Sequence, residues 1–179
     1  MIYVCSYDSP IGRFLLASDG VYLIGLWMES QRYFGSDIHE EVTKKSDLAV
    51  FCRTKKWLNQ YFAGECSSCE GIPVCPRGSE FQQLVWQILR EIPYGEVRTY
   101  GDIAKEVAKR MGKEKMSSQA VGNAVGRNPI SILIPCHRVV GQKGNLVGYG
   151  GGIQRKIYLL HLEGIDLSTY YIPKNCSFL

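Results

Sequence analysis

The sequence lacks long apolar runs, an even set of cysteines and internal repeats, and these absences narrow the class of protein. No stretch reaches the roughly 18 continuous apolar residues of a membrane span, so no membrane partner is expected. The N-terminus, Met1 to Asp8, has neither the basic start nor the apolar core of a secretion signal. The cysteines number seven, and an odd count without such a signal favours reduced thiols over disulfides. We therefore expect a cytoplasmic protein, or a nuclear one if the source has a nucleus.

What is present is an ordinary globular composition whose charge is divided unevenly along 179 residues. Residues 1–76 carry a net charge of −2, whereas residues 77–179 carry +6. A basic half is a weak electrostatic indication of a partner that bears phosphates. The stretch 64–78 is rich in Gly, Cys, Ser and Pro, which is typical of a connector. We therefore expect an N-terminal domain with its connector over 1–76 and a C-terminal domain over 77–179.

The first half predicts a small α/β domain built on an antiparallel meander. Asp19-Gly20 lies between apolar runs, which is a strong hairpin signal. The polar and poorly periodic stretch 29–46 predicts a loop, and Asp47 predicts the cap of a helix that ends near Phe62. The expected strands are 2–7, 13–18 and 21–27.

A cluster of cysteines in the connector has the spacing of metal or redox sites. Cys66 and Cys69 are separated by two residues, and Cys75 follows six residues later. A zinc site needs a fourth ligand, and no second spaced pair supplies one. We favour a loop of reduced cysteines, and we expect neither a metal nor a cofactor.

The second half predicts a mainly helical domain that resembles a winged helix-turn-helix. Ser79 predicts the cap of a helix that runs to about Glu91, and Thr99 with Asp102 resembles a capping box that opens a helix through about Met111. A short helix over 119–126, built from small residues, begins at Ser117 or Ser118. Two short helices joined by a tight linker are typical of a helix-turn-helix. The fold class expected for the whole chain is therefore α+β.

The run Ile130 to Ile134, followed by Pro135, Cys136 and His137, is the stretch that suggests chemistry. The apolar run predicts a buried strand, which Pro135 ends because proline cannot donate to a sheet ladder. A thiol beside an imidazole is what a nucleophilic cysteine needs, since the thiolate is the reactive form. An arbitrary Cys-His pair is more often an inert thiol beside a surface histidine. The pair alone leaves both interpretations open.

Several short motifs surround this pair. They are Pro93-Tyr94-Gly95-Glu96-Val97, Thr99-Tyr100-Gly101, Ala120-Val121-Gly122, Asn128-Pro129, Ile134-Pro135-Cys136-His137-Arg138-Val139-Val140 and Gly148-Tyr149-Gly150-Gly151-Gly152. Together they strongly resemble the motifs of the O6-alkylguanine-DNA alkyltransferases. The resemblance covers Phe81 to Gly164, about half of the chain, and the N-terminal meander resembles the family's variable first domain more weakly. It implies DNA repair by one irreversible transfer of a methyl or alkyl group from O6 of guanine to Cys136.

The same resemblance implies a role for each catalytic position. Cys136 matches the acceptor thiol, and His137 matches the histidine that deprotonates it through a water. Glu163 matches the acid that orients this histidine. Tyr100 matches the tyrosine that protonates N3 of guanine as the base leaves.

Substrate and DNA contacts are also implied by position. The backbone carbonyls of Cys136 and Val139 match acceptors for the guanine amino group, and the N–H of Gly150 matches a donor to O6. Asn128 matches the asparagine that holds the turn beside the site, and Tyr149 is the remaining expected substrate-binding residue. The implied partner is double-stranded DNA containing O6-alkylguanine, bound by a monomer that extrudes the damaged base. The expected DNA-binding residues are Arg98, Gln119, Ala120, Asn123, Arg127 and Arg138.

One position departs from the family pattern, and three other functions remain to be compared. Family members commonly carry an arginine where this chain has Gln119, which lacks the fixed charge and planar fork of arginine. A lesion-binding protein without efficient transfer is the first alternative, but such proteins lack the acceptor cysteine. A cysteine hydrolase is disfavoured because its nucleophile and base normally come from distant segments. A transcriptional regulator would need more base-reading side chains on its recognition helix. The range of adducts, including O4-alkylthymine, stays open.

Overall fold

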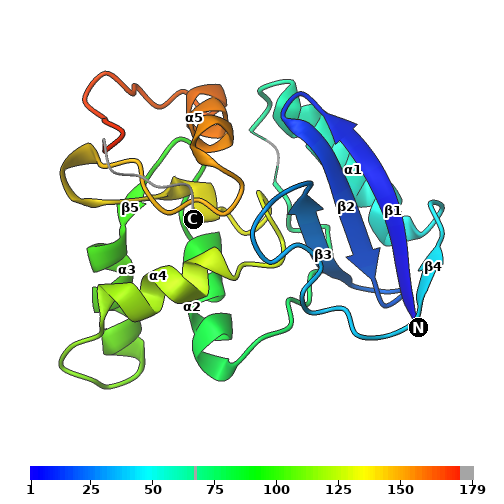
Figure 1. Ribbon diagram of the computed structural model, residues 1–179, viewed down its shortest axis with the longest axis horizontal. Coiled ribbons are helices and arrows are strands. Elements are labelled where there is room, and N and C mark those ends of the chain that lie inside the picture. Colours follow the sequence, from blue (N-terminus) through cyan, green and yellow to red (C-terminus); the bar gives the residue numbers. More distant parts are fainter. Residues whose placement is uncertain (67, 174–179) are drawn as a thin grey trace. The chain divides into compact units, whose positions relative to one another are not determined.

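The computed structural model describes residues 1–66 and 68–173, and it divides into two compact units (Figure 1). One unit comprises Met1–Arg77 with Pro129–Leu133, and the other comprises Gly78–Asn128 with Ile134–Leu179. The N-terminal unit holds an antiparallel meander and the C-terminal unit is mainly helical, so the predicted α+β class is confirmed. Within the described part of the chain, no helix is long and apolar enough to span a bilayer.

The N-terminal unit is built on a four-stranded sheet with the order β3-β2-β1-β4. The strands β1 (Ile2–Ser9), β2 (Gly12–Ser18) and β3 (Leu23–Met28) form the predicted meander. The loop predicted over 29–46 was wrong in part, because β4 (Val42–Lys44) pairs in parallel with β1. Residues of β4 are exposed or half-buried, so this strand leaves no apolar alternation in the sequence.

The helix α1 (Ala49–Phe62) lies across β1 and β2 (Figure 1). Leu48 is its N-cap and makes no side-chain hydrogen bond, so the predicted cap at Asp47 was wrong by one residue. The ring of Phe62 lies 6.4 Å from that of Phe14 on β2, which joins the helix to the sheet through aromatic packing. On the sheet, a buried cluster consists of Ile2, Val4, Ala17, Ile24 and Trp27.

Two segments from elsewhere in the chain cover the outer edge of β3. The N–H of Leu23 donates to the Pro73 carbonyl at 2.8 Å, and the N–H of Leu26 donates to the Pro129 carbonyl at 2.8 Å. The N–H of Ser131 in turn donates to the Leu26 carbonyl at 2.9 Å. These bonds satisfy an edge that would otherwise be open to association. The boundary was proposed between residues 76 and 77, but the segment Pro129–Leu133 of the second half also belongs to the first unit and bonds to β3.

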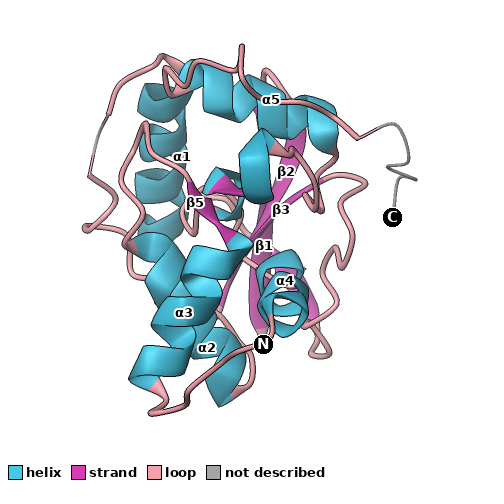
Figure 2. Ribbon diagram, turned by 90° about the vertical axis from the view of Figure 1, so that its left-hand side faces the viewer, coloured by secondary structure: helices cyan, strands magenta, loops and turns pink. Residues whose placement is uncertain are grey.

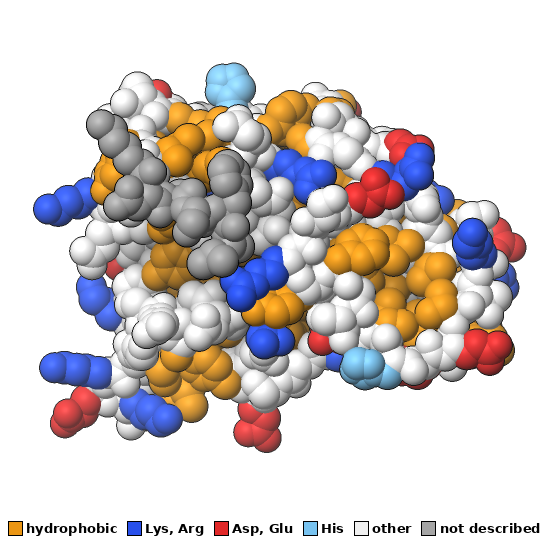
Figure 3. Space-filling model, viewed as in Figure 1, with side chains coloured by type: hydrophobic (Ala, Val, Ile, Leu, Met, Phe, Trp, Pro, Cys, Tyr) orange, Lys and Arg blue, Asp and Glu red, His pale blue; other side chains and the backbone are white. Residues whose placement is uncertain are grey.

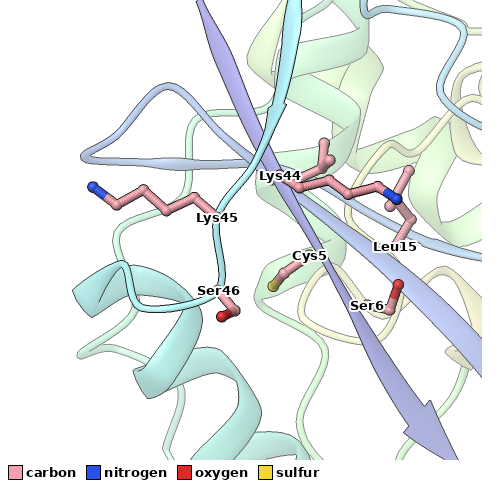
Figure 4. Close-up of a pocket in the computed structure, with 7 residues that line it drawn as sticks. Cys5, Ser6, Leu15, Lys44, Lys45 and Ser46 are labelled. Atoms are coloured by element: carbon pink, nitrogen blue, oxygen red, sulfur yellow. The ribbon is translucent and has the colours of Figure 1, made fainter.

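A hollow in the N-terminal unit lies between β1 and the chain that follows β4 (Figure 4). The thiol of Cys5 and the hydroxyl of Ser46 point into the same space (Figure 4). Burial raises the pKa of Cys5, and a hydrogen bond and attraction to Lys55 oppose this rise without reversing it. The thiol of Cys5 therefore remains protonated at neutral pH.

The three cysteines of the connector differ in exposure. Cys66 and Cys75 are exposed and Cys69 is half-buried, while Ser67 between them lies outside the described residues. Among the residues that the structure describes, no group of three or more His, Cys, Asp or Glu could hold a metal ion.

Three helices, α2 (Glu80–Arg90), α3 (Tyr100–Arg110) and α4 (Ser118–Gly126), pack against one another in the C-terminal unit (Figure 2). The predicted capping residues Ser79 and Thr99 are confirmed, because each side chain accepts an N–H bond within a complete capping box. Ser117 caps α4 in the same way but without a reciprocal partner. The indole N–H of Trp86 donates to the Ala124 carbonyl at 2.9 Å and ties α2 to α4.

The remaining elements of this unit surround the Cys-His pair in the sequence. A two-stranded parallel sheet joins β5 (Arg98–Thr99) to β6 (Val139–Val140). The helix α5 (Ile153–Leu162) ends near Gly164, where a positive φ of 79° suits glycine.

Candidate active site

The thiol of Cys136 is presented by a buried turn and not by a strand. The strand predicted over residues 130–134 was wrong, because Ile130 bridges Leu26 and the chain then turns at residues 132 and 133. Ile132 has a φ of 70°, which is uncommon for a β-branched residue and marks the turn. The run is apolar because the turn is buried, so hydrophobicity alone could not distinguish it from a strand. Cys136 follows as the first residue of a short 3-10 helix, η1 (Cys136–Arg138), and is 8% exposed.

Asn128 lies before this turn, and its side chain bonds to two groups that follow the turn. Its side-chain amide donates to the Ile134 carbonyl at 2.7 Å and to Sγ of Cys136 at 3.1 Å. Asn128 is itself buried, so both bonds form away from bulk water. The amide therefore fixes the direction of the thiol and offers a donor to a sulfur that gains negative charge.

His137 is held by a buried carboxylate on the far end of α5. Its Nε2 lies 2.7 Å from Oε1 of Glu163, and the side chains of both residues are fully buried. Arg138 donates from Nε to Oε2 of Glu163 at 2.8 Å and from a terminal nitrogen to Oε1 at 3.0 Å. The carboxylate thus accepts from an imidazole and a guanidinium together.

The pKa values in this cluster separate the charged groups from the neutral ones. Burial alone would raise the pKa of Glu163, but hydrogen bonds and attraction from His137 and Arg138 outweigh it and lower the value to about 2. Burial lowers the pKa of His137, and Glu163 opposes this only partly. At neutral pH the carboxyl is therefore ionised, and the imidazole is neutral and able to accept a proton.

The Cys136 thiol is protonated in the resting site. Its burial raises the pKa, while the hydrogen bond from Asn128 and the charge of Lys156 lower it to a smaller extent. Nucleophilic attack therefore needs a base to remove the proton at the time of reaction.

Lys156 is a site residue that sequence reasoning missed. Its ammonium donates to the carbonyls of Val139 at 2.5 Å and Val147 at 2.9 Å, and the side chain is fully buried. Burial lowers its pKa from 10.5 to about 8, while the charge of Cys136 acts in the opposite direction. A signal was available, because Lys156 lies among Ile153, Ile157 and Leu160 at the spacing of a buried helical face.

Tyr100 reaches the glycine-rich loop from the start of α3. Its hydroxyl donates to the Gly148 carbonyl at 3.0 Å, and a Cβ placed on Gly148 would lie 2.5 Å from the hydroxyl oxygen. Gly148 also has a φ of 75°, so only glycine allows this approach. Burial, followed by the charge of Cys136, raises the pKa of Tyr100, which keeps its phenol protonated.

The other residues expected to bind substrate lie in the same unit. Tyr149 is buried, and its hydroxyl has no hydrogen-bond partner among the residues that the structure covers. Burial, and to a smaller extent the charge of Cys136, raises the pKa of Tyr149 and keeps its phenol protonated. Gly150 is half-buried in the turn before α5, and the carbonyl of Val139 already accepts from Lys156. A carbonyl oxygen has two lone pairs, so Val139 can still accept a second donor.

The residues expected to contact DNA separate into two groups. Gln119, Asn123 and Arg127 are exposed and four residues apart along α4 and its end, which places them on one face. Ala120 and Arg98 are half-buried.

Arg138 was expected to contact DNA, and the structure shows its guanidinium engaged with groups of the protein itself. The residue is 9% exposed, and its guanidinium donates to Glu163 and to the Ile92 carbonyl at 2.6 Å. Its charge is therefore committed to the buried carboxylate that holds His137. The carboxylate that neutralises Arg138 belongs to Glu163, 25 residues further along the chain, and this pairing was not visible in the sequence.

A buried cysteine and a neutral histidine oriented by a carboxylate lie in one unit with the packed helices α2, α3 and α4, so the class of protein is one with a helical domain around a buried Cys-His-Glu cluster. The model of the 6-O-methylguanine DNA methyltransferase DNA-binding domain matches residues 80–165. The model of the ribonuclease-like domain of the same methyltransferase matches residues 2–76. The chain belongs to the 6-O-methylguanine DNA methyltransferase family.

Individual relatives and solved structures agree with this assignment. A methylated-DNA–protein-cysteine methyltransferase of Haemophilus influenzae is 43% identical over 173 residues, which are 97% of this chain and 90% of the relative. A protein of the same description from Mycobacterium leprae is 45% identical over 170 residues, covering 94% and 96% of the two chains. The crystal structure of Mycobacterium tuberculosis OGT in complex with DNA is similar with a TM-score of 0.78 and 42% identity, covering 90% of this chain and 92% of that one.

Proposed function

We propose that this chain repairs alkylated DNA directly, by moving the alkyl group from O6 of guanine to Sγ of Cys136. The observation that carries the proposal is a buried thiol, bound by Asn128 and followed in the chain by a neutral histidine that Glu163 holds at 2.7 Å. The relatives' shared description as methylated-DNA–protein-cysteine methyltransferases supports the same reaction.

The proton of the thiol leaves through His137. Because the ionised Glu163 can only accept hydrogen bonds, Nε2 of His137 carries the ring proton and Nδ1 is the nitrogen that takes up another. A water between Sγ and Nδ1 relays the proton, and Glu163 stabilises the imidazolium that forms. General-base assistance of this kind contributes about 10²–10⁴-fold in rate.

The leaving base is stabilised by Tyr100. The thiolate attacks the alkyl carbon, so an S–C bond forms as the O6–C bond breaks and its electron pair moves into the guanine ring. The phenol of Tyr100 donates its proton to N3, and the proton taken from Cys136 restores the phenol through solvent. A donor aimed at developing charge is among the largest contributions that a site can make.

The transfer is used once because its product is a thioether. No group in the proposed mechanism removes the alkyl carbon from sulfur again, so the chain is consumed by one lesion. The substrate we propose is double-stranded DNA in which an O6-alkylguanine is extruded from the stack, which costs less for a damaged base. The exposed face of α4, with Gln119 and Asn123, faces the duplex in this arrangement.

One copy of the chain carries every residue of the mechanism, so we propose that it acts as a monomer. The location we propose is the cytoplasm, or the nucleus of a eukaryotic source. All six cysteines in the described residues are free thiols, which fits a reducing compartment.

Intact-protein mass spectrometry tests the proposed function. The wild type is incubated with an excess of duplex that contains O6-methylguanine, and we expect one added methyl group per chain with no further turnover. Cys136→Ala is expected to bind the duplex without any increase in mass. Binding by the wild type without a mass increase would instead favour a lesion-binding protein, and repeated turnover would contradict the single-use transfer. A parallel duplex with O4-methylthymine measures whether the site accepts that base.

A further inference from the structure

A second basic feature of the C-terminal unit lies outside the alkyl-transfer site. A hollow of about 420 Å³ lies between α3 and the segment that leads to α4. Its rim carries four lysines and one carboxylate, and Ala104, Ala108 and Met116 also line it. We call it the lysine hollow, and its lysines are Lys105, Lys109, Lys113 and Lys115.

The local sequence explains why these lysines meet. Lys105 and Lys109 are four residues apart on α3 and so lie on one face of that helix. After α3 the N–H of Lys113 donates to the Ala108 carbonyl at 2.9 Å, and Gly112 has a φ of 63°. The chain therefore turns back at the end of α3 and brings residues 113–115 to the same hollow.

The charge of the lysine hollow is poorly neutralised by the protein itself. Four lysines face one carboxylate, Glu114, which leaves an excess of three positive charges on the lining. Lys105 lies 3.9 Å from Asp102, but both side chains are largely exposed, so this pair is weak. Within the described residues, Lys109, Lys113 and Lys115 form no ion pair. Figure 3 shows basic side chains, with acidic ones among them, projecting around the end of the molecule that holds α3.

The position of the lysine hollow indicates which anion it meets. Ser118, the first residue of α4, lines the hollow, and Ser117 caps the same helix. The hollow is therefore continuous with the N-terminus of α4, where the helix dipole also favours negative charge. In helix-turn-helix proteins the first helix of the pair crosses the DNA backbone while the second enters a groove. The corresponding first helix here is α3, which supplies Lys105 and Lys109.

We infer that the lysine hollow is a contact site for the phosphate backbone of the duplex, separate from the site that extrudes and dealkylates the base. The inference rests on the proposed function for the identity of the partner as DNA. The small side chains of Ala104 and Ala108 leave room for a phosphate group beside the ammonium groups. The contact adds affinity for any sequence and takes no part in the transfer of the alkyl group.

A salt series on duplex binding tests this inference. Affinity for DNA falls as salt rises, and removing one phosphate-binding charge makes the slope of log affinity against log salt shallower by about 0.9. The double variant Lys109→Gln with Lys113→Gln is therefore expected to have a slope shallower by about 1 to 2 and to bind more weakly at low salt. The matched control is Lys44→Gln with Lys56→Gln, which removes the same charge from exposed lysines of the N-terminal unit and should leave the slope unchanged. A slope equal to that of the wild type in both variants would overturn the inference.

Two further measurements separate a local effect from misfolding and from failure of the proposed function. Glu114→Gln removes the one negative charge on the lining, so it should tighten binding at low salt, an effect that misfolding would not produce. Transfer from free O6-methylguanine base, which has no phosphate, reports whether the alkyl-transfer site is intact in each variant. If the wild type shows no transfer, the proposed function fails, while a reduced slope in the lysine variant would still support the phosphate contact. Weaker binding by Glu114→Gln would contradict the inference.

Discussion

Two buried cysteines, Cys5 in the N-terminal unit and Cys136 in the C-terminal unit, have similar surroundings in several respects. They are 9% and 8% exposed, and burial raises the pKa of both thiols. A lysine opposes that rise in each case, Lys55 for Cys5 and Lys156 for Cys136. Burial beside a cation therefore does not distinguish a nucleophile from a structural thiol.

The difference between them lies in the means to remove a proton. The Cys5 pKa is shifted by burial, Lys55 and Cys52, and neither a histidine nor a carboxylate is among these causes. Cys136 is followed by a histidine whose pKa is lowered by burial and whose ring is fixed by Glu163. It also receives a hydrogen bond from Asn128 on sulfur. Activation thus depends on an oriented base and a donor, which reach Cys136 from three different segments.

The largest expected effect comes from removing the base. His137→Gln keeps a neutral side chain that can donate to Glu163 but cannot take up the thiol proton. We expect the single-turnover rate on an O6-methylguanine duplex to fall about 10²–10⁴-fold. Cys5→Ser is the matched change at the other thiol and should react at the wild-type rate. A His137→Gln rate within a few-fold of wild type would show that the base does not distinguish the two cysteines.

The next effect concerns stability and its pH dependence. Glu163→Gln leaves the guanidinium of Arg138 without its carboxylate, and breaking a buried pair costs about 3–5 kcal/mol. The folded pKa of Glu163, about 2, lies below its ordinary value of 4.5. The contribution of the ionised Glu163 to the free energy of unfolding is therefore fully present above pH 4.5 and is lost as the pH falls towards 2.

Urea unfolding at several pH values measures this prediction. The wild type should lose stability over the acid range in which Glu163 becomes protonated, and the difference between wild type and Glu163→Gln should shrink there. The exposed Glu65→Gln is a control that should follow the wild type. A constant difference between Glu163→Gln and wild type from neutral to acid pH would contradict the assigned ionisation.

A smaller effect is expected from the two lysines. Lys156→Met removes the charge that lowers the Cys136 pKa, so the thiolate forms less readily and transfer should slow several-fold. The pKa of Lys156 is about 8, so the ammonium loses its charge above that pH and the two rates should converge there. Lys55→Met, which acts on Cys5, should leave transfer unchanged. Rates with the free base across this pH range provide the measurement, and a gap that persists well above pH 8 would count against an electrostatic role.

The smallest effect is expected on DNA binding through Gln119, which by resemblance stands where the family pattern has an arginine. Gln119→Arg adds a charge on the exposed face of α4 and should tighten duplex binding a few-fold, with a steeper salt dependence by about 0.9 for one added phosphate contact. The transfer rate on the free base should not change. Equal affinities of variant and wild type in a salt-matched titration would remove Gln119 from the DNA contact.

Local patterns predicted the elements that depend on neighbouring residues. The meander of β1 to β3 and the caps at Ser79 and Thr99 follow from turn and capping residues within a few positions, and all are confirmed. The strand β4 was missed because it is exposed and forms only by pairing with β1, which lies 40 residues earlier in the sequence, as in the pair of Ile2 with Val42. The buried turn before Cys136 was taken for a strand because burial, and not pairing, sets its composition.

The residues of the candidate site were named from the sequence, but the ion pairs and buried charges around them were not. Cys136, His137, Glu163 and Tyr100 were identified through the resemblance of their motifs to a known family, and their roles remain proposals. Arg138 pairs with Glu163, and Lys156 donates to the Val139 carbonyl. Each of these partners lies far away in the sequence, so neither partner could be inferred from spacing. The pKa and the pairing of a buried charged group depend on the groups around it, and these groups are brought together only in the folded chain.

Peptide mapping by mass spectrometry after reaction with an O6-methylguanine duplex tests the central distinction most directly. We predict one methyl group on the peptide that contains Cys136 and an unmodified thiol in the peptide that contains Cys5. The five other cysteines should also remain unmodified. A methyl group on Cys5, or on any cysteine other than Cys136, would contradict the assignment of Cys136 as the acceptor.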